Sequence, residues 1–307
     1  MSGGDVLARP AVHVTVAGAS DPGRRRAENQ DSFLVADLCA PVADGPWKVS
    51  TDPDDSPPSA RFDVCPSGFL AIVADGMGGA AAGAVASRLA VAKVYGGMAT
   101  SGAGDTHPTP DGFARRLRQA VEDANDALHA HAAHDPACEG MGTTMTAAGI
   151  LDGWVYVAQV GDSRAYLLRG GRAVQITRDQ SLVQQMIEAG TLTEAQAETS
   201  GIASVLMQAL GPRSRVEVDL TRQELRRGDL LLLCSDGLFR TTPDAEMAAA
   251  AERTPDLAAL CAELVATANE RGGPDNVTVV AVRLDGEGVQ PPRDGDTVGR
   301  ATFQPAG

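Results

Sequence analysis

The sequence FLAIVADGMGGAAAG (residues 69–83) joins an apolar run to an aspartate, and then to a stretch that is mostly glycine and alanine. The run is short, aliphatic and bounded by turn residues, which predicts a buried β-strand. Aspartate is unfavourable within strands, yet Asp75 directly follows the part that must be buried. A carboxylate in this position needs a partner that the neighbouring residues do not supply.

Similar strands recur along the chain. They are predicted at residues 11–20, 31–37, 68–75, 143–151, 154–162, 164–169, 229–236 and 276–284. Turn pairs in the segments 151–154 and 168–177 predict β-hairpins, and hairpins imply antiparallel sheet. Helices are predicted at residues 82–98, 111–134, 179–189, 193–198 and 256–270. Helices come between sets of hairpin strands rather than after every strand, so we expect an α+β fold with two packed antiparallel sheets and outer helices.

Some segments lack these patterns. Residues 40–67 are dense in proline, aspartate and serine and are predicted to be a mobile surface insertion. Residues 286–307 are predicted to be a flexible tail, and residues 1–10 a flexible N-terminus. The folded part is therefore expected to span residues 11–285.

Composition narrows the choice of partners and compartment. The chain has 307 residues and a net charge of -14, and nucleic acids and anionic membranes both favour a basic surface. Its longest apolar runs are too short to span a bilayer, and the start lacks the pattern of a signal peptide. Five scattered cysteines without a CxxC pair indicate reduced, buried thiols and no zinc site: Cys39, Cys65, Cys138, Cys234 and Cys261. We expect a soluble, cytoplasmic protein that binds neither nucleic acid nor membrane.

Asp75 is one of five aspartates at the ends of predicted core strands. The others are Asp31, Asp162, Asp236 and Asp275. Any one of them alone is explained more simply as a turn residue. If the strands are neighbours, however, the carboxylates converge, and two such charges about 4 Å apart repel by about 4 kcal/mol at an intermediate dielectric. A cluster of this kind would protonate or separate unless a cation lay among its members.

The candidate ligands are all oxygens, and none of the five histidines lies in these turns. This donor set favours Mg²⁺, Mn²⁺ or Ca²⁺ over zinc. Gly76 has no side chain, so its carbonyl can approach a metal beside Asp75. A two-metal cluster suits the hydrolysis of phosphate esters, and the arginines of GRRRAENQD (residues 23–31) suit phosphate binding. The chain has no GxxxxGK[ST] loop, and Ser163 does not lie in a G-x-S-x-G turn.

Six segments appear in the order expected of one known family. They are GRRRAENQD (23–31), VADGMGGAAAG (73–83), GMGTTMTA (140–147), VGDSRAY (160–166), LLCSDGL (232–238) and GGPDNVTVV (272–280). Over roughly residues 11–285 the chain resembles the metal-dependent protein phosphatases (PPM, type 2C), and in particular bacterial serine/threonine phosphatases. The resemblance implies a four-layer α-β-β-α sandwich with two Mn²⁺ or Mg²⁺ ions at one edge.

The resemblance also implies metal ligands. Asp75 would bridge the two ions, and the Gly76 carbonyl would bind one of them. Asp236 and Asp275 would bind the other ion. Asp162 matches the position of a weaker third ion in bacterial members.

Further roles follow from the same resemblance. Arg26 would bind the phosphate, and Asp31 would hold a water molecule and help to deprotonate it. Gln30 and Asn276 would lie behind the ligands. Residues 178–203 align with the flap beside the active site.

Three positions depart from the family pattern. Gln30 stands where many members have glutamate, and Ala80 stands where histidine is common. Met77 replaces the histidine proposed as the general acid of animal relatives, so the leaving group would take its proton from water or another residue. The insertion at residues 40–67 is longer than in compact bacterial members and has no assigned role.

The resemblance implies an enzyme that hydrolyses phosphoserine and phosphothreonine monoesters by direct attack of water, without a phospho-enzyme. Its substrates would be phosphorylated proteins made by a serine/threonine kinase, and the chain would act as a monomer. Two alternatives remain open: a non-catalytic member that binds phosphoproteins, and a phosphatase dedicated to a single signalling regulator.

Overall fold

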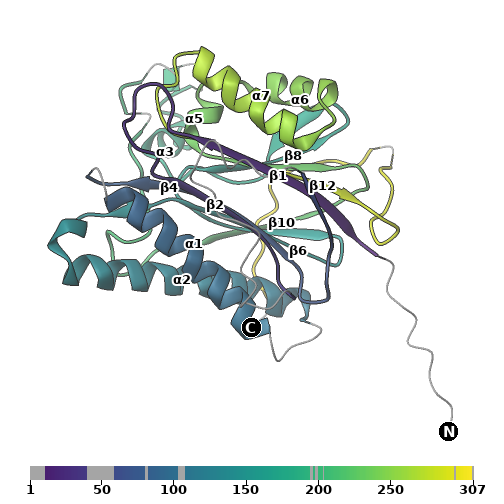
Figure 1. Cartoon of the computed structure of the whole chain (residues 1–307), viewed down its shortest axis with the longest axis horizontal. Helices are drawn as coiled ribbons and strands as arrows, with labels where there is room; N and C mark the ends of the chain where they lie inside the picture. Colours follow the sequence, from purple (N-terminus) through teal and green to yellow (C-terminus); the bar gives the residue numbers. More distant parts are fainter. Residues whose placement is uncertain are drawn as a thin grey trace, which may run out of the picture.

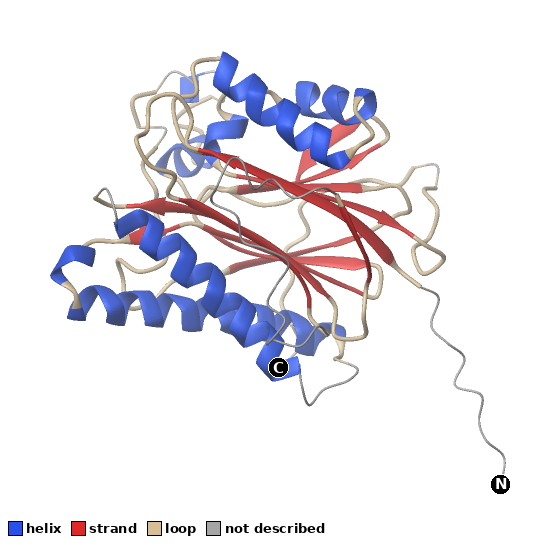
Figure 2. Cartoon of the chain, in the orientation of Figure 1, coloured by secondary structure: helices blue, strands red, loops and turns tan. Residues whose placement is uncertain are grey.

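The computed structural model describes residues 11–39, 59–79, 82–102, 108–193, 196–197, 200–202, 204–293 and 295–305. Two antiparallel sheets lie face to face in the centre, as Figure 2 shows. The first sheet has the order β3-β1-β12-β11-β8-β9. Its strands are β1 (His13–Asp21), β3 (Ala60–Asp63), β8 (Arg164–Arg169), β9 (Arg172–Gln175), β11 (Leu230–Cys234) and β12 (Val277–Asp285).

The second sheet has the order β10-β7-β6-β4-β2, with the short β5 paired to β4. Its strands are β2 (Asp31–Asp37), β4 (Phe69–Met77), β5 (Gly142–Thr143), β6 (Met145–Leu151), β7 (Trp154–Val160) and β10 (Asp219–Glu224). The predicted strand at 143–151 is thus divided at Thr144. Both predicted hairpins are present, as the β6–β7 and β8–β9 pairs.

Helices cover both outer faces of the sandwich (Figure 1). α1 (Ala82–Gly102) and α2 (Pro110–His134) lie over the second sheet, and α6 (Asp244–Arg253) and α7 (Leu257–Glu270) lie over the first. The shorter helices are η3 (Pro136–Cys138), α3 (Leu182–Glu188) and α5 (Asp236–Phe239). Among the described helices, none is both long and apolar enough to cross a membrane. The predicted four-layer α-β-β-α sandwich is confirmed.

Burial on both faces explains why the central strands are apolar throughout. In β4, Phe69 and Val73 pack between the two sheets, whereas Leu70 and Ile72 pack against α1 and α2. A strand in this position has no solvent-facing side, so the usual alternation of polar and apolar residues is lost.

The insertion and the cysteines differ from expectation. Residues 60–63 form β3, which pairs with β1, and Cys65 forms a disulfide with Cys39. The insertion is therefore fixed to the domain at its C-terminal part, and two of the cysteines are not reduced thiols; residues 40–58 lie outside the described residues. Cys138, Cys234 and Cys261 are free and buried, as predicted. The pairing was not predictable from spacing, because 26 residues separate the two partners.

The predicted flexible tail also differs. Residues 295–305, here called the C-terminal strap, lie along β10 at the edge of the second sheet. The Arg222 amide donates to the Ala301 carbonyl at 3.0 Å, and the Phe303 amide donates to the Leu220 carbonyl at 2.7 Å. The Phe303 side chain is only 8% exposed. The strap thus extends the sheet and adds an aromatic residue to the core beneath it. The predicted N-terminal residues 1–10 are outside the described part of the chain.

Candidate metal centre and active site

The five aspartates come together because the two sheets end at the same edge of the sandwich. Asp31 opens β2 and lies directly opposite Asp75 of β4 in the antiparallel register. Asp236 follows β11 and begins α5, and Asp275 precedes β12, the strand beside β11. Like charges placed opposite each other on paired strands are destabilising. The repulsion between these two carboxylates therefore destabilises the strand pair locally, and a positively charged partner in the site must offset it.

A cavity of about 290 Å³ lies at this edge. Its lining includes every residue predicted as a metal ligand, together with Arg26, Gln30 and Asn276. The ligand positions are Asp75, Gly76, Asp162, Asp236 and Asp275. Asp31 lies behind the lining, and its charge acts on the pKa of Asp75. Arg26 and Asp275, which are 249 positions apart in the chain, thus meet in one pocket.

Asp31 is 1% exposed and is held through one of its two carboxylate oxygens. Ser235 and Thr278 each donate a hydroxyl hydrogen bond to Oδ2 at 2.7 Å. The other oxygen, Oδ1, is buried and has no hydrogen-bond partner. Burial raises the pKa of Asp31 to about 7, against the opposing effect of the two hydroxyls. A buried carboxylate oxygen without a donor is costly unless something in the pocket contacts it.

The pKa values of the neighbouring carboxyl groups are raised as well. Burial, followed by the charges of Asp31 and Asp236, raises the pKa of Asp75 well above its ordinary value. Burial also raises the pKa of Asp162 to about 7, and the charge of Asp236 adds to it. Burial raises the pKa of Asp236, whose Oδ1 is the second buried carboxylate oxygen without a partner. Together these groups favour a divalent cation, which would stabilise their charged forms.

Gly76 is required by packing as well as by any ligand role. A Cβ atom at this position would lie 2.2 Å from the Gly83 carbonyl oxygen and 2.6 Å from that of Gln30. The Gly76 amide donates to the same Gln30 carbonyl at 3.1 Å. The end of β4 is therefore wedged between α1 and the loop before β2, with no room for a side chain. Prediction from the sequence had identified only the access of its carbonyl to a metal.

Arg26 lies at the mouth of the pocket and pairs with Asp275. Its Nε and Nη2 donate to the two carboxylate oxygens at 2.8 and 2.7 Å, and its side chain is 57% exposed. The predicted phosphate-binding arginine and a predicted metal ligand are therefore in contact. This two-point pair engages the Nε and Nη2 side of the guanidinium and holds the group beside the pocket.

Asn276 holds the loop that carries Arg26. Its Nδ2 donates to the carbonyls of Pro22 and Glu28, both at 2.9 Å, and its Oδ1 accepts from the Gln30 amide at 2.9 Å. These three bonds connect the start of β12 to both sides of the arginine triplet. Asn276 thus lines the pocket and also positions the loop that carries Arg26.

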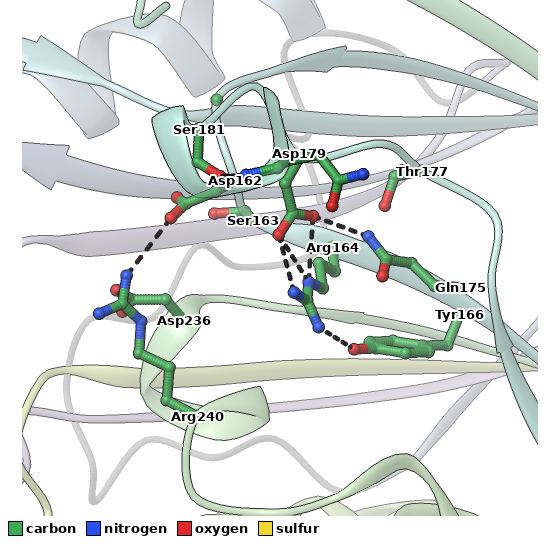
Figure 3. A network of polar contacts seen from close by, with 12 residues as sticks. Asp162, Ser163, Arg164, Tyr166, Gln175, Thr177, Asp179, Ser181, Asp236 and Arg240 are labelled. Atoms are coloured by element: carbon green, nitrogen blue, oxygen red, sulfur yellow. Dashed lines mark hydrogen bonds and ion pairs between the residues drawn. The ribbon is translucent and has the colours of Figure 1, made fainter. Parts of the chain in front are cut away.

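Arg240 is a pocket residue that the sequence motifs did not identify. It follows α5, and its Nε lies 3.0 Å from Asp236 Oδ2. Its Nη2 lies 3.5 Å from Asp162 Oδ2, as Figure 3 shows. The four-residue spacing from Asp236 was the available signal, because residues at this spacing share one helix face.

The flap is described only in part. Its α3 is tied to the segment after it by bonds from the Leu182 amide to the Val205 carbonyl at 2.9 Å and from the Met207 amide to the Gln180 carbonyl at 2.8 Å. That segment contributes Ser204 and Leu206 to the pocket lining. Met77 also lines the pocket and is 37% exposed, whereas Ala80 is not among the described residues.

Comparison with known proteins agrees with this architecture. Residues 59–279 match the family model described as Protein phosphatase 2C. The chain is 37% identical over 274 residues to the serine/threonine protein phosphatase PstP of Mycobacterium tuberculosis, covering 89% of this chain and 46% of that protein. It is 36% identical over 216 residues to the serine/threonine phosphatase stp of Listeria monocytogenes, covering 70% of this chain and 84% of the relative. This chain therefore spans about half the length of PstP and most of stp.

A solved structure shares the same fold. The catalytic domain of PstP, in complex with two manganese ions, superposes with a TM-score of 0.69 at 34% identity, covering 89% of this chain and 99% of that one. The family match runs from β3 to the start of β12 and includes the four aspartates that line the pocket. The relatives share more than a third of the aligned residues. The chain is therefore a member of the protein phosphatase 2C family.

Proposed function

We propose that this chain is a metal-dependent protein phosphatase that hydrolyses phosphoserine and phosphothreonine monoesters with water as the nucleophile and without a phospho-enzyme. The observation that carries the proposal is the convergence of four aspartates on one pocket, with Asp31 behind them. Asp31 and Asp236 each have a buried carboxylate oxygen that lacks a hydrogen-bond partner. The guanidinium of Arg26, which is paired with Asp275 and whose side chain is 57% exposed, lines the same pocket. The names of the relatives, which are serine/threonine phosphatases, support the same activity.

The donor set fits two divalent cations. Asp75, the Gly76 carbonyl, Asp236 and Asp275 would hold them, since all four offer oxygen and all line the pocket. When bound, Mn²⁺ or Mg²⁺ supplies Lewis-acid activation of water and of the phosphoryl oxygens.

The other roles in the reaction belong to side chains of the protein itself. Asp31 is fixed through Oδ2 by Ser235 and Thr278, so its Oδ1 is positioned as the acceptor for a proton of the attacking water. Arg26 binds the phosphate oxygens with the donors that Asp275 does not use. Met77 offers no proton at the position of the proposed general acid, so the leaving oxygen takes its proton from solvent.

Substrates and setting are part of the proposal. The open pocket and exposed Arg26 suit a phosphorylated side chain presented by another protein, the product of a serine/threonine kinase. The net charge of -14 argues against nucleic acid and anionic membranes as partners. We further propose that the chain acts as a monomer in the cytoplasm.

The test compares Asp236→Asn with Asp256→Asn. Asp256 caps α7 outside the pocket, and asparagine caps helices about as well, so this control makes the same chemical change without touching the site. Turnover of a phosphothreonine peptide and of p-nitrophenyl phosphate is measured with Mn²⁺ and again after chelation. The turnover of Asp236→Asn should fall by more than roughly 10–100-fold, which is the typical loss when a residue that supports a metal ligand is replaced. The control should match wild type.

Two results would redirect the assignment. Wild-type turnover by Asp236→Asn would contradict the proposed site. A wild-type chain that binds the phosphopeptide but never cleaves it, with any metal, would be a non-catalytic phosphoprotein-binding member. Cleavage of only one among many phosphoproteins would instead indicate a phosphatase dedicated to a single regulator.

A further inference from the structure

Arg240 is a fixed positive charge between two pocket carboxylates. Its guanidinium contacts Asp236 Oδ2 through Nε and Asp162 Oδ2 through Nη2 (Figure 3). The Arg240 side chain is 31% exposed, whereas those of Asp162 and Asp236 are 8% and 13% exposed. A cation of the chain itself therefore already lies against the carboxylate that family resemblance gives to a third metal ion.

A second contact holds the Asp162 loop against the helix that carries Arg240. Arg164, two residues after Asp162, stacks its guanidinium on the ring of Phe239 at 3.7 Å. The same guanidinium binds both oxygens of buried Asp179 through Nε, at 3.0 and 3.1 Å, and again through Nη2 at 2.7 Å. Because Phe239 directly precedes Arg240, this stack fixes the separation between Asp162 and the Arg240 backbone.

The contact also determines which oxygen of Asp236 faces the pocket. Arg240 engages Oδ2, and Oδ1 is the buried atom that has no hydrogen-bond partner. Arg240 thus orients Asp236 so that one oxygen remains available to a cation. A third divalent ion at Asp162 would have to displace this guanidinium or lie against it, and charges of the same sign repel strongly at such short range. Arg26 differs, because its side chain is 57% exposed and can turn into solvent when Asp275 binds a metal, whereas Arg240 is 31% exposed and lies next to the stacked Phe239.

We propose that Arg240 takes the place of a third divalent cation at Asp162, so that this chain binds two metal ions and not three. Asp162 then serves as the anchor of Arg240, and Arg240 is a positioning residue for Asp236. The inference rests on the proposed two-metal function. Its own evidence is the Asp162–Arg240–Asp236 contact.

The experiment counts bound Mn²⁺ by equilibrium dialysis with elemental analysis, and by isothermal titration up to millimolar Mn²⁺, without measuring turnover. We expect two ions for wild type and a third, weak ion for Arg240→Ser. The third ion should disappear again in Arg240→Ser combined with Asp162→Ala. Arg240→Lys, which keeps the charge, should bind two.

Arg25→Ser is the matched control, because it removes one positive charge from an exposed position next to Arg26. It should bind two ions. A third ion in wild type that is lost in Asp162→Ala would overturn the inference, as would an Arg240→Ser variant that is folded and still binds only two. If Arg240→Ser does not fold, the test is the number of Mn²⁺ ions bound by wild type and by Asp162→Ala. Two ions bound by each of these proteins would support the inference. Fewer than two ions in wild type would instead refute the proposed two-metal function.

Discussion

Replacing Phe303 by alanine should weaken the attachment of the C-terminal strap to the edge of the second sheet. The Phe303 ring packs edge-on against Tyr156, with ring centroids 5.6 Å apart. The Arg222 guanidinium lies over the same ring, 4.5 Å from the ring centre. The substitution removes both contacts and leaves a space beside the core of the second sheet, while the backbone bonds of the strap remain possible.

The size of the effect follows from burial. Replacing a fully buried phenylalanine by alanine typically lowers the free energy of unfolding by about 3–5 kcal/mol. Phe303 is 8% exposed and lies on a terminal segment that can relax, so we expect the low end, about 3 kcal/mol. Unfolding a chain of 307 residues has an entropy of about 0.6 kcal/mol/K, so the melting temperature should fall by about 5 °C.

The assay is thermal and urea unfolding of Phe303→Ala beside Gln304→Ala. Gln304 is the next residue and is exposed, so its truncation tests the same backbone position without the buried ring. Amide hydrogen exchange at Arg222 and Phe303 then reports on the strap itself, since the Arg222 amide donates to the Ala301 carbonyl and the Phe303 amide donates to the Leu220 carbonyl. Equal midpoints and equal exchange in the two variants would refute the packed strap.

Two further predictions concern pH and the pocket. Hydrogen bonds from Arg226 lower the pKa of Asp296 to about 2, so the stability it contributes is fully present above its ordinary pKa near 4 and is lost as pH falls toward 2. The difference in melting temperature between wild type and Asp296→Asn should therefore shrink over that interval; a difference that does not change with pH would contradict the ion pair. Gly76→Ala places a Cβ against two backbone carbonyls and should reduce Mn²⁺ affinity at least about 10-fold, whereas Gly79→Ala, which meets nothing within 4 Å, should bind as wild type does. Equal Mn²⁺ affinities of the two variants in titration calorimetry would contradict this prediction, because they would mean that the end of β4 can move to make room for the Cβ without weakening metal binding.

Much of the centre of the fold was predictable because its strands are buried on both faces. Runs such as residues 69–74 and 230–234 are apolar throughout, and a run of that length bounded by turn residues has few structural alternatives. The strands β3 and β10 and the helix α6 were missed. β10 reads DLTRQE and lies beside β7 near the sheet edge, where Leu220 is its one apolar side chain in the core, so the segment has no apolar run that would predict a strand.

The candidate site was predictable to the same extent. Aspartate beside a buried strand is unusual enough to be noticed, and five such positions indicated that they converge. Arg240 gave no comparable signal, because an arginine after a short helix is ordinary in sequence. Its importance arises from Asp162, which is 78 positions away and reaches it only through the packing of two sheets.

By itself, the sequence determined the two-layer sheet core, the order of its central strands along the chain and the set of acidic residues at their ends. These depend on local patterns of burial and on side-chain chemistry, and both can be recognised from residues that are close together in the sequence. Only the tertiary structure decided that Cys39 meets Cys65, that the strap covers β10 and that Arg240 bridges Asp162 and Asp236. The Cys39–Cys65, strap–β10 and Arg240–Asp162 contacts each join segments that are distant in the chain. A local pattern indicates that a group needs a partner, but it does not specify which distant residue supplies it.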